Sequence, residues 1–353
     1  MKTSRFLIAI CSLLLVACGE RSNTSDEAQT SSNSLVVCSY GGSFQEAQRK
    51  AFFEPFEKET GIKVIEANWS GEFAKIKSMV ESDNVQWDLV TAAESSIIER
   101  GINEGILAEI DFSNIDTTKF LPLSYNQYML GFDYYSTVLA YNEEAFADGD
   151  YPKDWKEFWD TERYPGKRSL RKDPRTTLEI ALMADGVHKD SLYPLDVNRA
   201  FESLNRIKDQ VVWWTSGHQP VQLMASKEVV AASVFNGRVW SAVKTDSLPL
   251  QIVWKGGALD LDSWIIPKGA KNYENAMRLV EYTTRPEVQN RLVEYISYSP
   301  TLKESYDFLG LEVRADLPTS PENYEYQYHF NGKWWSAHEA EVLDQWNAWL
   351  VDH

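Results

Sequence analysis

The sequence predicts an α/β fold built from mainly parallel sheets that are flanked by helices. Short apolar segments and amphipathic segments alternate along most of the chain, and this β-α-β order is typical of parallel sheets with helices on both faces. The chain has 353 residues, which is enough for two domains. Apolar residues make up 43% of it, so both domains can bury a core.

The N-terminus has the features of an export signal. A positively charged start precedes an apolar run over residues 6–17 that is too short to span a bilayer well. The segment LLLVAC resembles the lipobox of bacterial lipoproteins, which implies cleavage before Cys18 and acylation of its thiol. The alternative is an ordinary signal peptide cleaved nearby. We expect a signal peptide over residues 1–17 and, because residues 18–34 are polar, a flexible tether there.

The first elements follow the tether in regular order. Residues 35–39 are expected to form a strand. Ser43, followed three residues later by Glu46, predicts a helix that begins with a capping box. That helix is expected to kink at Pro55 and to end at Gly61.

The same alternation predicts the remaining elements of the chain. Up to residue 142 they are strands at 62–69, 87–93 and 136–142 and helices at 72–82 and from about 95 to 101 or 105. Between residues 143 and 235 they are a helical region at 154–160, a strand at 167–172, a loop at 173–174, a helix from near 176, and a strand at 229–235. An Asn-Gly turn is expected to end that last strand before another helix. Separate strands at 250–254 and 261–267 follow, and then two helices within 272–296 that are broken at Pro286. Apolar residues at 342, 343, 346, 349 and 350 predict an amphipathic C-terminal helix.

Composition and motifs exclude several classes of protein. A formal net charge of -17 argues against nucleic-acid binding. The three cysteines offer no disulfide within the chain, because Cys11 lies in the signal, Cys18 would carry lipid and Cys38 lies in an apolar strand. No histidine has the spacing of a metal ligand, so we expect neither a metal ion nor a cofactor.

The loop Gly41-Gly42-Ser43 joins the first strand to the first helix. It lacks the lysine of a phosphate-binding loop, so nucleotide binding is not indicated. Two interpretations remain. The glycines make a tight turn, or they let a ligand approach the backbone at the edge of the sheet, where folds of this class bind ligands.

Carboxylates and aromatic side chains follow several predicted strands. The acids are Glu94, Asp173, Asp260 and Asp262, and the aromatic residues are Tyr40, Tyr134, Tyr135, Trp213, Trp214, Phe235 and Tyr298. Each acid alone reads as a helix cap or a surface charge, but together they suit a cationic amine, which carboxylates neutralise and aromatic faces attract. Arg175 and Arg238 occupy comparable positions and would clamp a carboxylate or form surface ion pairs.

Several segments carry a resemblance to a known family. They are FFEPFEKETGIKVIEANW, WDLVTAAESSIIERGINEGIL, STVLAYN, ASVFNGR, LDSWIIPKGAKNYENAMRLVEY and YSPT, spread over about residues 35–305. With them the chain resembles the spermidine/putrescine-binding group of periplasmic substrate-binding proteins of ABC importers. The resemblance implies a type II periplasmic-binding-protein fold, with ligand held in the cleft between two lobes that close by hinge motion.

The family's pocket positions fall on identifiable residues of this chain. They are Tyr40, Glu94, Ser95, Ser96, Asp173, Phe235, Asp260, Asp262 and Tyr298. A second acid of the polyamine binders is replaced here by Thr176, and a tryptophan by Asp260, so the pocket is altered. The resemblance therefore also leaves room for a zwitterion such as an ω-amino acid.

We predict an extracytoplasmic solute-binding lipoprotein that is monomeric, lacks enzymatic activity and delivers a polyamine-like amine to an ABC permease. Lobe 1 is expected at 35–138 plus 260–305, and lobe 2 at 142–255 plus 306–353. Asp173 and Asp262 would hold ammonium groups. The other predicted binding residues are Tyr40, Gly42, Ser43, Glu94, Ser95, Arg175, Phe235, Arg238, Asp260 and Tyr298.

Three alternatives to this ligand and function remain open. A zwitterionic ω-amino acid would use the same acids together with the arginines. A non-amine solute such as a sugar, an oxyanion or a ferric complex is the second, and paired tyrosines at Tyr134 and Tyr135 are the feature that favours a ferric complex. The third is an exported hydrolase, which would need a nucleophile and a base within hydrogen-bonding reach in the cleft.

Overall fold

The computed structural model describes residues 33–146 and 149–351 of the chain. The expected signal peptide at 1–17, the acylated Cys18 and nearly all of the expected tether at 18–34 lie outside the described residues. The first strand already includes Ser34, one residue earlier than the sequence indicated. Among the helices of the described ranges, none combines the length and the apolar character needed to cross a membrane.

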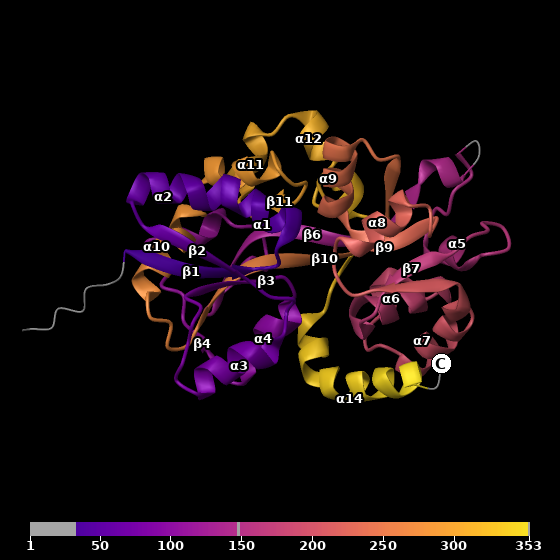
Figure 1. The fold of residues 1–353 in the computed structure, drawn as a ribbon, viewed down its shortest axis with the longest axis horizontal. Coiled ribbons are helices and arrows are strands. Elements are labelled where there is room, and N and C mark those ends of the chain that lie inside the picture. Colours follow the sequence, from indigo (N-terminus) through magenta and orange to yellow (C-terminus); the bar gives the residue numbers. More distant parts are fainter. Residues whose placement is uncertain (1–32, 147–148, 352–353) are drawn as a thin grey trace, which may run out of the picture. The chain divides into compact units, whose positions relative to one another are not determined.

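Strands and helices alternate along the described chain, which confirms the predicted α/β class (Figure 1). The strands are β1 (Ser34–Ser39), β2 (Lys63–Asn68), β3 (Leu89–Ala92), β4 (Leu107–Ala108), β5 (Tyr125–Asn126), β6 (Met129–Asn142), β7 (Arg168–Arg171), β8 (Val211–Trp214), β9 (Ala231–Phe235), β10 (Leu250–Pro267), β11 (Ser299–Pro300) and β12 (Tyr328–His329). The α-helices are α1 (Gly42–Gln48), α2 (Glu54–Thr60), α3 (Phe73–Glu81), α4 (Ser95–Asn103), α5 (Trp155–Trp159), α6 (Pro174–Ala184), α7 (Val197–Asn205), α8 (Gln219–Ala225), α9 (Asn236–Asp246), α10 (Tyr273–Tyr282), α11 (Pro286–Val293), α12 (Leu311–Ala315), α13 (Pro321–Tyr324) and α14 (Gly332–Val351).

The main strands form one path of neighbours in the order β2-β1-β3-β10-β6-β9-β7-β8. The pairs β1–β2, β1–β3, β7–β8 and β7–β9 are parallel. The long strands β6 and β10 run antiparallel to each other and to their outer neighbours β9 and β3. The path therefore consists of two parallel groups joined through two crossing strands.

Each parallel group carries its own lobe with its own core. Lobe 1 is built on β1, β2 and β3, and its core contains large buried side chains such as Phe52, Phe132 and Trp264. Lobe 2 is built on β7, β8 and β9, and its core contains Trp155 and Trp335. Figure 1 shows the two groups of helices and strands on either side of the middle of β6 and β10. The carboxyl ends of the parallel strands approach each other at this junction.

The helix that follows β1 departs from the prediction at its start. It begins at Gly42 without a side-chain cap, because the hydroxyl of Ser43 accepts a hydrogen bond from Arg238 and does not cap the backbone. The predicted capping box is therefore wrong. The helix continues through one π-helical turn, Arg49–Phe53, into α2. It ends as predicted at Gly61, whose left-handed φ of 74° suits glycine.

Residues 250–267 form one long strand where the sequence predicted two. The register of β10 against β6 shifts between Val253 and Ala258, so the expected break is an irregularity inside a continuous strand. Gly256 lies at this point with a φ of 77°, and a Cβ there would lie 2.7 Å from the indole of Trp155. The glycine thus lets the strand bend against lobe 2 without ending.

The Asn-Gly pair after β9 is the start of α9, so the predicted turn is wrong. The side chain of Asn236 accepts a hydrogen bond from the backbone N–H of Ser136 and donates one to the backbone carbonyl of Ser297. A Cβ at Gly237 would lie 2.4 Å from the ring of Tyr298. Tertiary contacts, and not a turn, therefore explain both residues.

The C-terminal helix α14 contacts both lobes. Trp335 inserts into the core of lobe 2 and donates a hydrogen bond of 2.7 Å to Glu179 on α6. On the other side, Glu339 forms an ion pair of 3.1 Å with Arg100 on α4 of lobe 1. A Cβ at Gly332 would lie 2.6 Å from the backbone of Ser95, so this glycine permits close packing of α14 on α4.

Candidate functional site

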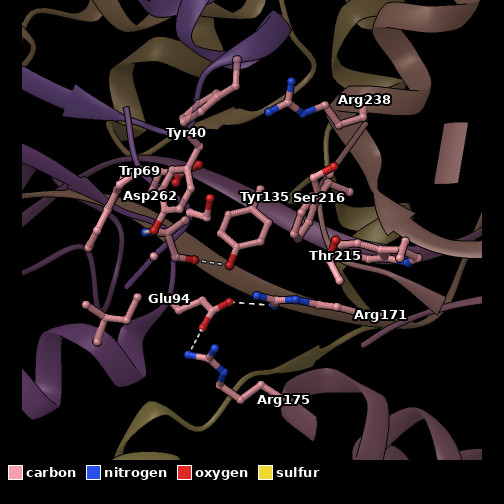
Figure 2. Close-up of a pocket in the computed structure, with 18 of the residues that line it drawn as sticks. Tyr40, Trp69, Glu94, Tyr135, Arg171, Arg175, Thr215, Ser216, Arg238 and Asp262 are labelled. Carbon is pink, nitrogen blue, oxygen red and sulfur yellow. Dashed lines mark hydrogen bonds and ion pairs between the residues drawn. The ribbon is translucent and has the colours of Figure 1, made fainter. Parts of the chain in front are cut away.

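A cavity of about 800 Å³, counting solvent at its mouth, lies between the two lobes. Seven aromatic side chains line it, from both lobes and the crossing strands: Tyr40, Phe44, Trp69, Tyr135, Trp214, Phe235 and Tyr298. Five charged side chains also line it: Glu94, Arg171, Arg175, Arg238 and Asp262. Figure 2 shows these groups converging on one space from different elements.

The aromatic residues support each other at the back of the cavity. Tyr135 on β6 packs against Phe235 at 5.6 Å and against Tyr298 at 5.9 Å between ring centroids. Phe235 also meets Trp214 edge to face, and Tyr40 lies 5.6 Å from Trp69. Rings held in this way present fixed apolar faces, which suit the methylene groups of a short aliphatic solute.

Two tyrosines fix the backbone that precedes Glu94. The hydroxyl of Tyr40 accepts a hydrogen bond of 3.1 Å from the N–H of Ala93, and the hydroxyl of Tyr135 donates to the carbonyl of the same residue. Burial raises the pKa of both hydroxyls, and the nearby Glu94 adds to the effect. Both tyrosines therefore stay neutral and position the end of β3.

Glu94 at the start of α4 joins the two lobes. Its carboxylate accepts a hydrogen bond of 2.7 Å from Arg171, at the end of β7, and lies 2.6 Å from Nη1 of Arg175 (Figure 2). The three side chains are 12–17% exposed, so water screens this contact only weakly. The negative charge of Glu94 is thus compensated by protein groups before any ligand arrives.

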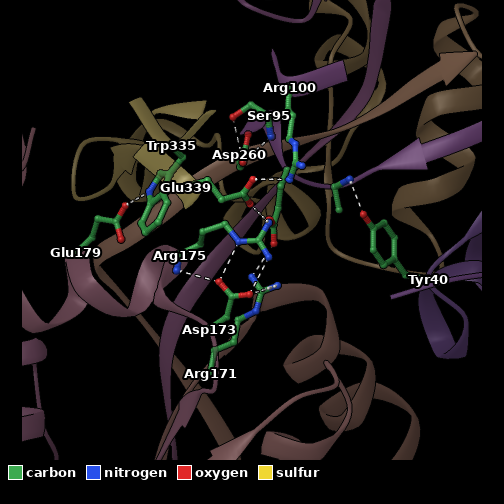
Figure 3. A network of polar contacts seen from close by, with 12 residues as sticks. Tyr40, Ser95, Arg100, Arg171, Asp173, Arg175, Glu179, Asp260, Trp335 and Glu339 are labelled. Atoms are coloured by element: carbon green, nitrogen blue, oxygen red, sulfur yellow. Dashed lines mark hydrogen bonds and ion pairs between the residues drawn. The ribbon is translucent and has the colours of Figure 1, made fainter. Parts of the chain in front are cut away.

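Asp173 lies behind Arg175 and is not among the residues that line the cavity. Its carboxylate caps the start of α6 through the backbone N–H of Arg175 and also accepts two hydrogen bonds, 2.7 and 2.9 Å long, from the guanidinium of that residue. Although burial opposes ionisation, Arg175 and Arg171 hold the pKa of Asp173 below its usual range. Figure 3 shows the wider network, in which Arg175 also approaches Glu339 of α14.

Arg238 on α9 reaches across the cavity to the glycine loop of lobe 1. It donates a hydrogen bond of 2.8 Å to the hydroxyl of Ser43, and a weaker one to the carbonyl of Gly41. Its Nε is buried without a hydrogen-bond partner, and no carboxylate of the described residues forms an ion pair with it. A Cβ at Gly42 would lie 2.8 Å from Nη1 of Arg238, so this glycine makes room for the guanidinium.

Asp262 on β10 lines the floor of the same cavity and is 2% exposed. One of its oxygens, Oδ1, is buried without a hydrogen-bond partner. Burial raises the pKa of this carboxyl to about 8, while a neighbouring carboxyl group and Arg238 act in the opposite direction. Within the described residues no lysine or arginine forms an ion pair with it.

Asp260 and Ser95 lie beside the main cavity and do not line it. Asp260 accepts hydrogen bonds from the N–H and the hydroxyl of Ser95 at the start of α4 (Figure 3). Burial raises the pKa of Asp260 well above its usual range. Asp260 lines a smaller adjacent cavity together with Glu94 and Arg175. Its contacts are those of a helix cap.

The structure therefore brings seven of the predicted binding residues to one cavity: Tyr40, Glu94, Arg175, Phe235, Arg238, Asp262 and Tyr298. Of the others, Gly42 and Ser43 contact Arg238, whereas Ser95, Asp173 and Asp260 act on neighbouring groups. Sequence reasoning missed Trp69 and Arg171. Both stand at the ends of predicted strands, the same signal that identified the rest.

The chain from 51 to 322 matches the model of the family described as bacterial extracellular solute-binding proteins. The chain belongs to this family. The match covers most of both lobes and most of the residues that line the cavity, so the cleft is that of a solute-binding protein of an ABC importer, with the two-lobed α/β fold that the resemblance implied.

Three similar proteins are named for, or solved with, a small ligand. A gamma-aminobutyric acid-binding protein of Pseudomonas aeruginosa is 36% identical over 330 residues, covering 92% of this chain and 93% of that protein. A spermidine/putrescine-binding periplasmic protein of Escherichia coli is 28% identical, covering 80% and 81%. The structure of AgtB from A. tumefaciens R10 in complex with agropinic acid has a TM-score of 0.83 at 35% identity, covering 90% of this chain and 98% of that chain.

Proposed function

We propose that this solute-binding protein captures a zwitterionic ω-amino acid, with its carboxylate on Arg238 and its ammonium group on Asp262. One observation carries the proposal. Arg238 and Asp262 line the same cavity with a basic and an acidic side chain, and each keeps a buried polar atom without a hydrogen-bond partner among the described residues. Buried polar atoms are usually satisfied, so this pair indicates where a ligand supplies the missing partners.

The charge balance of the cavity favours a zwitterion over a polyamine. Glu94 is compensated by Arg171 and Arg175, and Asp173 by Arg175, so neither acid offers an uncompensated charge to a second ammonium group. A diamine would also place a positive charge near the unpaired guanidinium of Arg238. A carboxylate there gains a charge-assisted contact in a site with little water.

The relatives support this assignment in different degrees. The protein of P. aeruginosa, which binds gamma-aminobutyric acid, is similar over nearly the whole chain, and AgtB holds a solute that is named as an acid. The spermidine/putrescine-binding relative keeps a polyamine as the second candidate, because Asp262 and the aromatic walls suit any ammonium group. We therefore place the ω-amino acid before the polyamine-like amine that the sequence favoured.

Isothermal titration calorimetry with three solutes of equal carbon-chain length tests the proposal: γ-aminobutyrate, putrescine and butyrate. We expect γ-aminobutyrate to bind tightest, because only it meets both unpaired groups. Tighter binding of putrescine would favour the polyamine, and tighter binding of butyrate would remove the role of Asp262. If none of the three binds at micromolar concentration, the ω-amino acid assignment is wrong.

The same proposal includes membrane attachment through a lipid on Cys18 and an absence of enzymatic activity. The family is described as extracellular solute-binding proteins, which supports the absence of enzymatic activity, and the lipobox-like segment before Cys18 supports the attachment. A Cys18→Ser variant is expected to move from the membrane fraction to the soluble extracytoplasmic fraction. Retention in the membrane would contradict acylation at this residue.

A further inference from the structure

Asp133, which sequence reasoning did not identify, lies next to the cavity but is not among the residues that line it. Asp133 lies on β6 directly opposite Asp262 on β10, and the two are register partners in the antiparallel pair. Side chains of directly opposed residues lie on the same face of a sheet and are close neighbours. Asp133 is fully buried, and Asp262 is 2% exposed. Two carboxyl groups therefore share one dry space at the floor of the cavity.

The surroundings of Asp133 offer it no other donor. Both of its carboxyl oxygens are buried and have no hydrogen-bond partner among the described residues. A carboxylate accepts hydrogen bonds only, whereas a protonated carboxyl donates one. Two ionised carboxylates in this position would repel each other without compensation.

We propose that Asp133 is a protonated positioning residue that donates a hydrogen bond to Asp262 and thereby sets the charge with which the cavity meets an ammonium group. In the empty cavity the pair also takes up a second proton, on Asp262. When a cationic ammonium enters, Asp262 releases that proton to solvent and Asp133 keeps its own. This inference rests on the proposed function for its ligand, but the protonation of the pair does not.

Other ionisable groups face the pair from each neighbouring element. Arg238 comes from α9, Tyr298 from the segment before β11, Tyr40 from the end of β1, and Tyr135 from β6. The pKa of each of these three tyrosines is raised by burial, so they stay neutral. Arg238 lowers the pKa of Asp262 but does not overcome its burial. The carboxyl pair is thus the group of this cluster that titrates in the physiological range.

The expected signature is a proton released on binding. Since burial raises the pKa of Asp262 to about 8 in the empty cavity, affinity for γ-aminobutyrate should rise with pH up to about that value, by up to about tenfold per pH unit. Calorimetry in buffers of different ionisation enthalpy measures the released proton directly. An affinity that is independent of pH, with no proton released, overturns the inference.

Two variants separate this role from a purely structural one. Asp133→Asn keeps a donor for Asp262 and should bind γ-aminobutyrate within a few-fold of the wild type. Asp133→Leu keeps the number and branching of the side-chain heavy atoms but removes the donor, so we expect at least tenfold weaker binding near neutral pH and a rise of affinity at higher pH. Equal pH profiles in all three proteins, or equal losses in both variants, overturn the inference.

Infrared difference spectroscopy of the ligand-free protein tests the pair without any ligand. The carbonyl absorption of protonated carboxyl groups should be weaker in Asp133→Asn than in the wild type. Identical spectra overturn the inference. If γ-aminobutyrate fails to bind while this absorption changes as expected, the proposed ligand is wrong and the protonated pair stands.

Discussion

Nη1 of Arg238 on lobe 2 donates a hydrogen bond of 2.8 Å to the hydroxyl of Ser43 on lobe 1. The contact crosses the cavity and holds the guanidinium over the glycine loop. Together with Glu94 between Arg171 and Arg175, it joins the lobes on two sides of the site. The structure therefore has its lobes closed, and the side chains proposed to bind the ligand face one cavity.

The glycine loop allows a matched test of the position of Arg238. Gly42→Ala places a Cβ 2.8 Å from Nη1, whereas Gly41→Ala meets no atom within 4 Å, and both residues have a similar positive φ of 59° and 64°. Both variants place a Cβ on a residue with positive φ, so both strain the backbone. We expect Gly42→Ala to bind γ-aminobutyrate roughly tenfold or more weakly than Gly41→Ala in calorimetry, because it alone displaces the guanidinium. Equal affinities of the two variants would show that the position of Arg238 does not matter.

Removing the charge of Glu94 should destabilise the closed protein. Glu94→Gln leaves the buried guanidinium groups of Arg171 and Arg175 with less compensation, and breaking a buried pair in this way costs about 3 kcal/mol. Urea unfolding measures the change in the free energy of unfolding. Glu59→Gln breaks an exposed pair with Arg285 and serves as control, with an expected change below about 1 kcal/mol. A change in Glu94→Gln no larger than that of the control would contradict a structural role for the pair.

Glu179 should make stability depend on pH. It is fully buried, accepts hydrogen bonds from Tyr193 and Trp335, and burial raises its pKa from 4.5 to about 7. Between pH values near these two pKa values, the unfolded chain loses the proton of Glu179 while the folded chain keeps it. The free energy of unfolding therefore falls as pH rises, by about 3 kcal/mol in all.

Urea unfolding at about pH 5 and about pH 8 measures this term. Between these conditions we expect the free energy of unfolding of Glu179→Gln to fall by about 3 kcal/mol less than that of the wild type, because glutamine does not titrate. Glu162→Gln, at an exposed position, should behave as the wild type. Parallel pH profiles of the wild type and Glu179→Gln would exclude a buried, titrating Glu179.

The packing of α14 on lobe 1 depends on Gly332. Gly332→Ala introduces a Cβ 2.6 Å from the backbone of Ser95, and such overpacking costs about 1–3 kcal/mol. Gly310→Ala is the matched control, since a Cβ there meets nothing within 4 Å and its φ is not positive. Thermal unfolding should show a lower Tm for Gly332→Ala than for the control. Equal Tm values would indicate that α14 can shift away from α4 at no cost.

Much of the fold follows from local patterns in the sequence. Apolar runs ended by polar residues predicted β1, β3 and β7, and Gly61 and Pro286 marked helix boundaries correctly, because these signals depend on the chain nearby. The unbroken β10 and the helical start at Asn236 could not be predicted in this way. Gly256 and Asn236 look like breaks in the sequence, but contacts with Trp155, Ser136 and Ser297 decide their conformations.

The site was predicted in outline from the rule that side chains after parallel strands meet at one edge of a sheet. Glu94, Arg238 and Asp262 were found by it, but their pairing was not. Whether Glu94 meets Arg171 or a ligand depends on distances between lobes that no local pattern encodes. Asp133 had one signal, because it is the one charged residue of β6.

The central claim is that Arg238 holds the carboxylate of a zwitterion, and calorimetry of Arg238→Ala with γ-aminobutyrate tests it most directly. Arg285→Ala, which breaks an exposed pair far from the cavity, is the control. We predict that Arg238→Ala weakens binding about a hundredfold, equivalent to about 3 kcal/mol, while Arg285→Ala binds as the wild type does. Unchanged affinity of Arg238→Ala for γ-aminobutyrate would contradict the account.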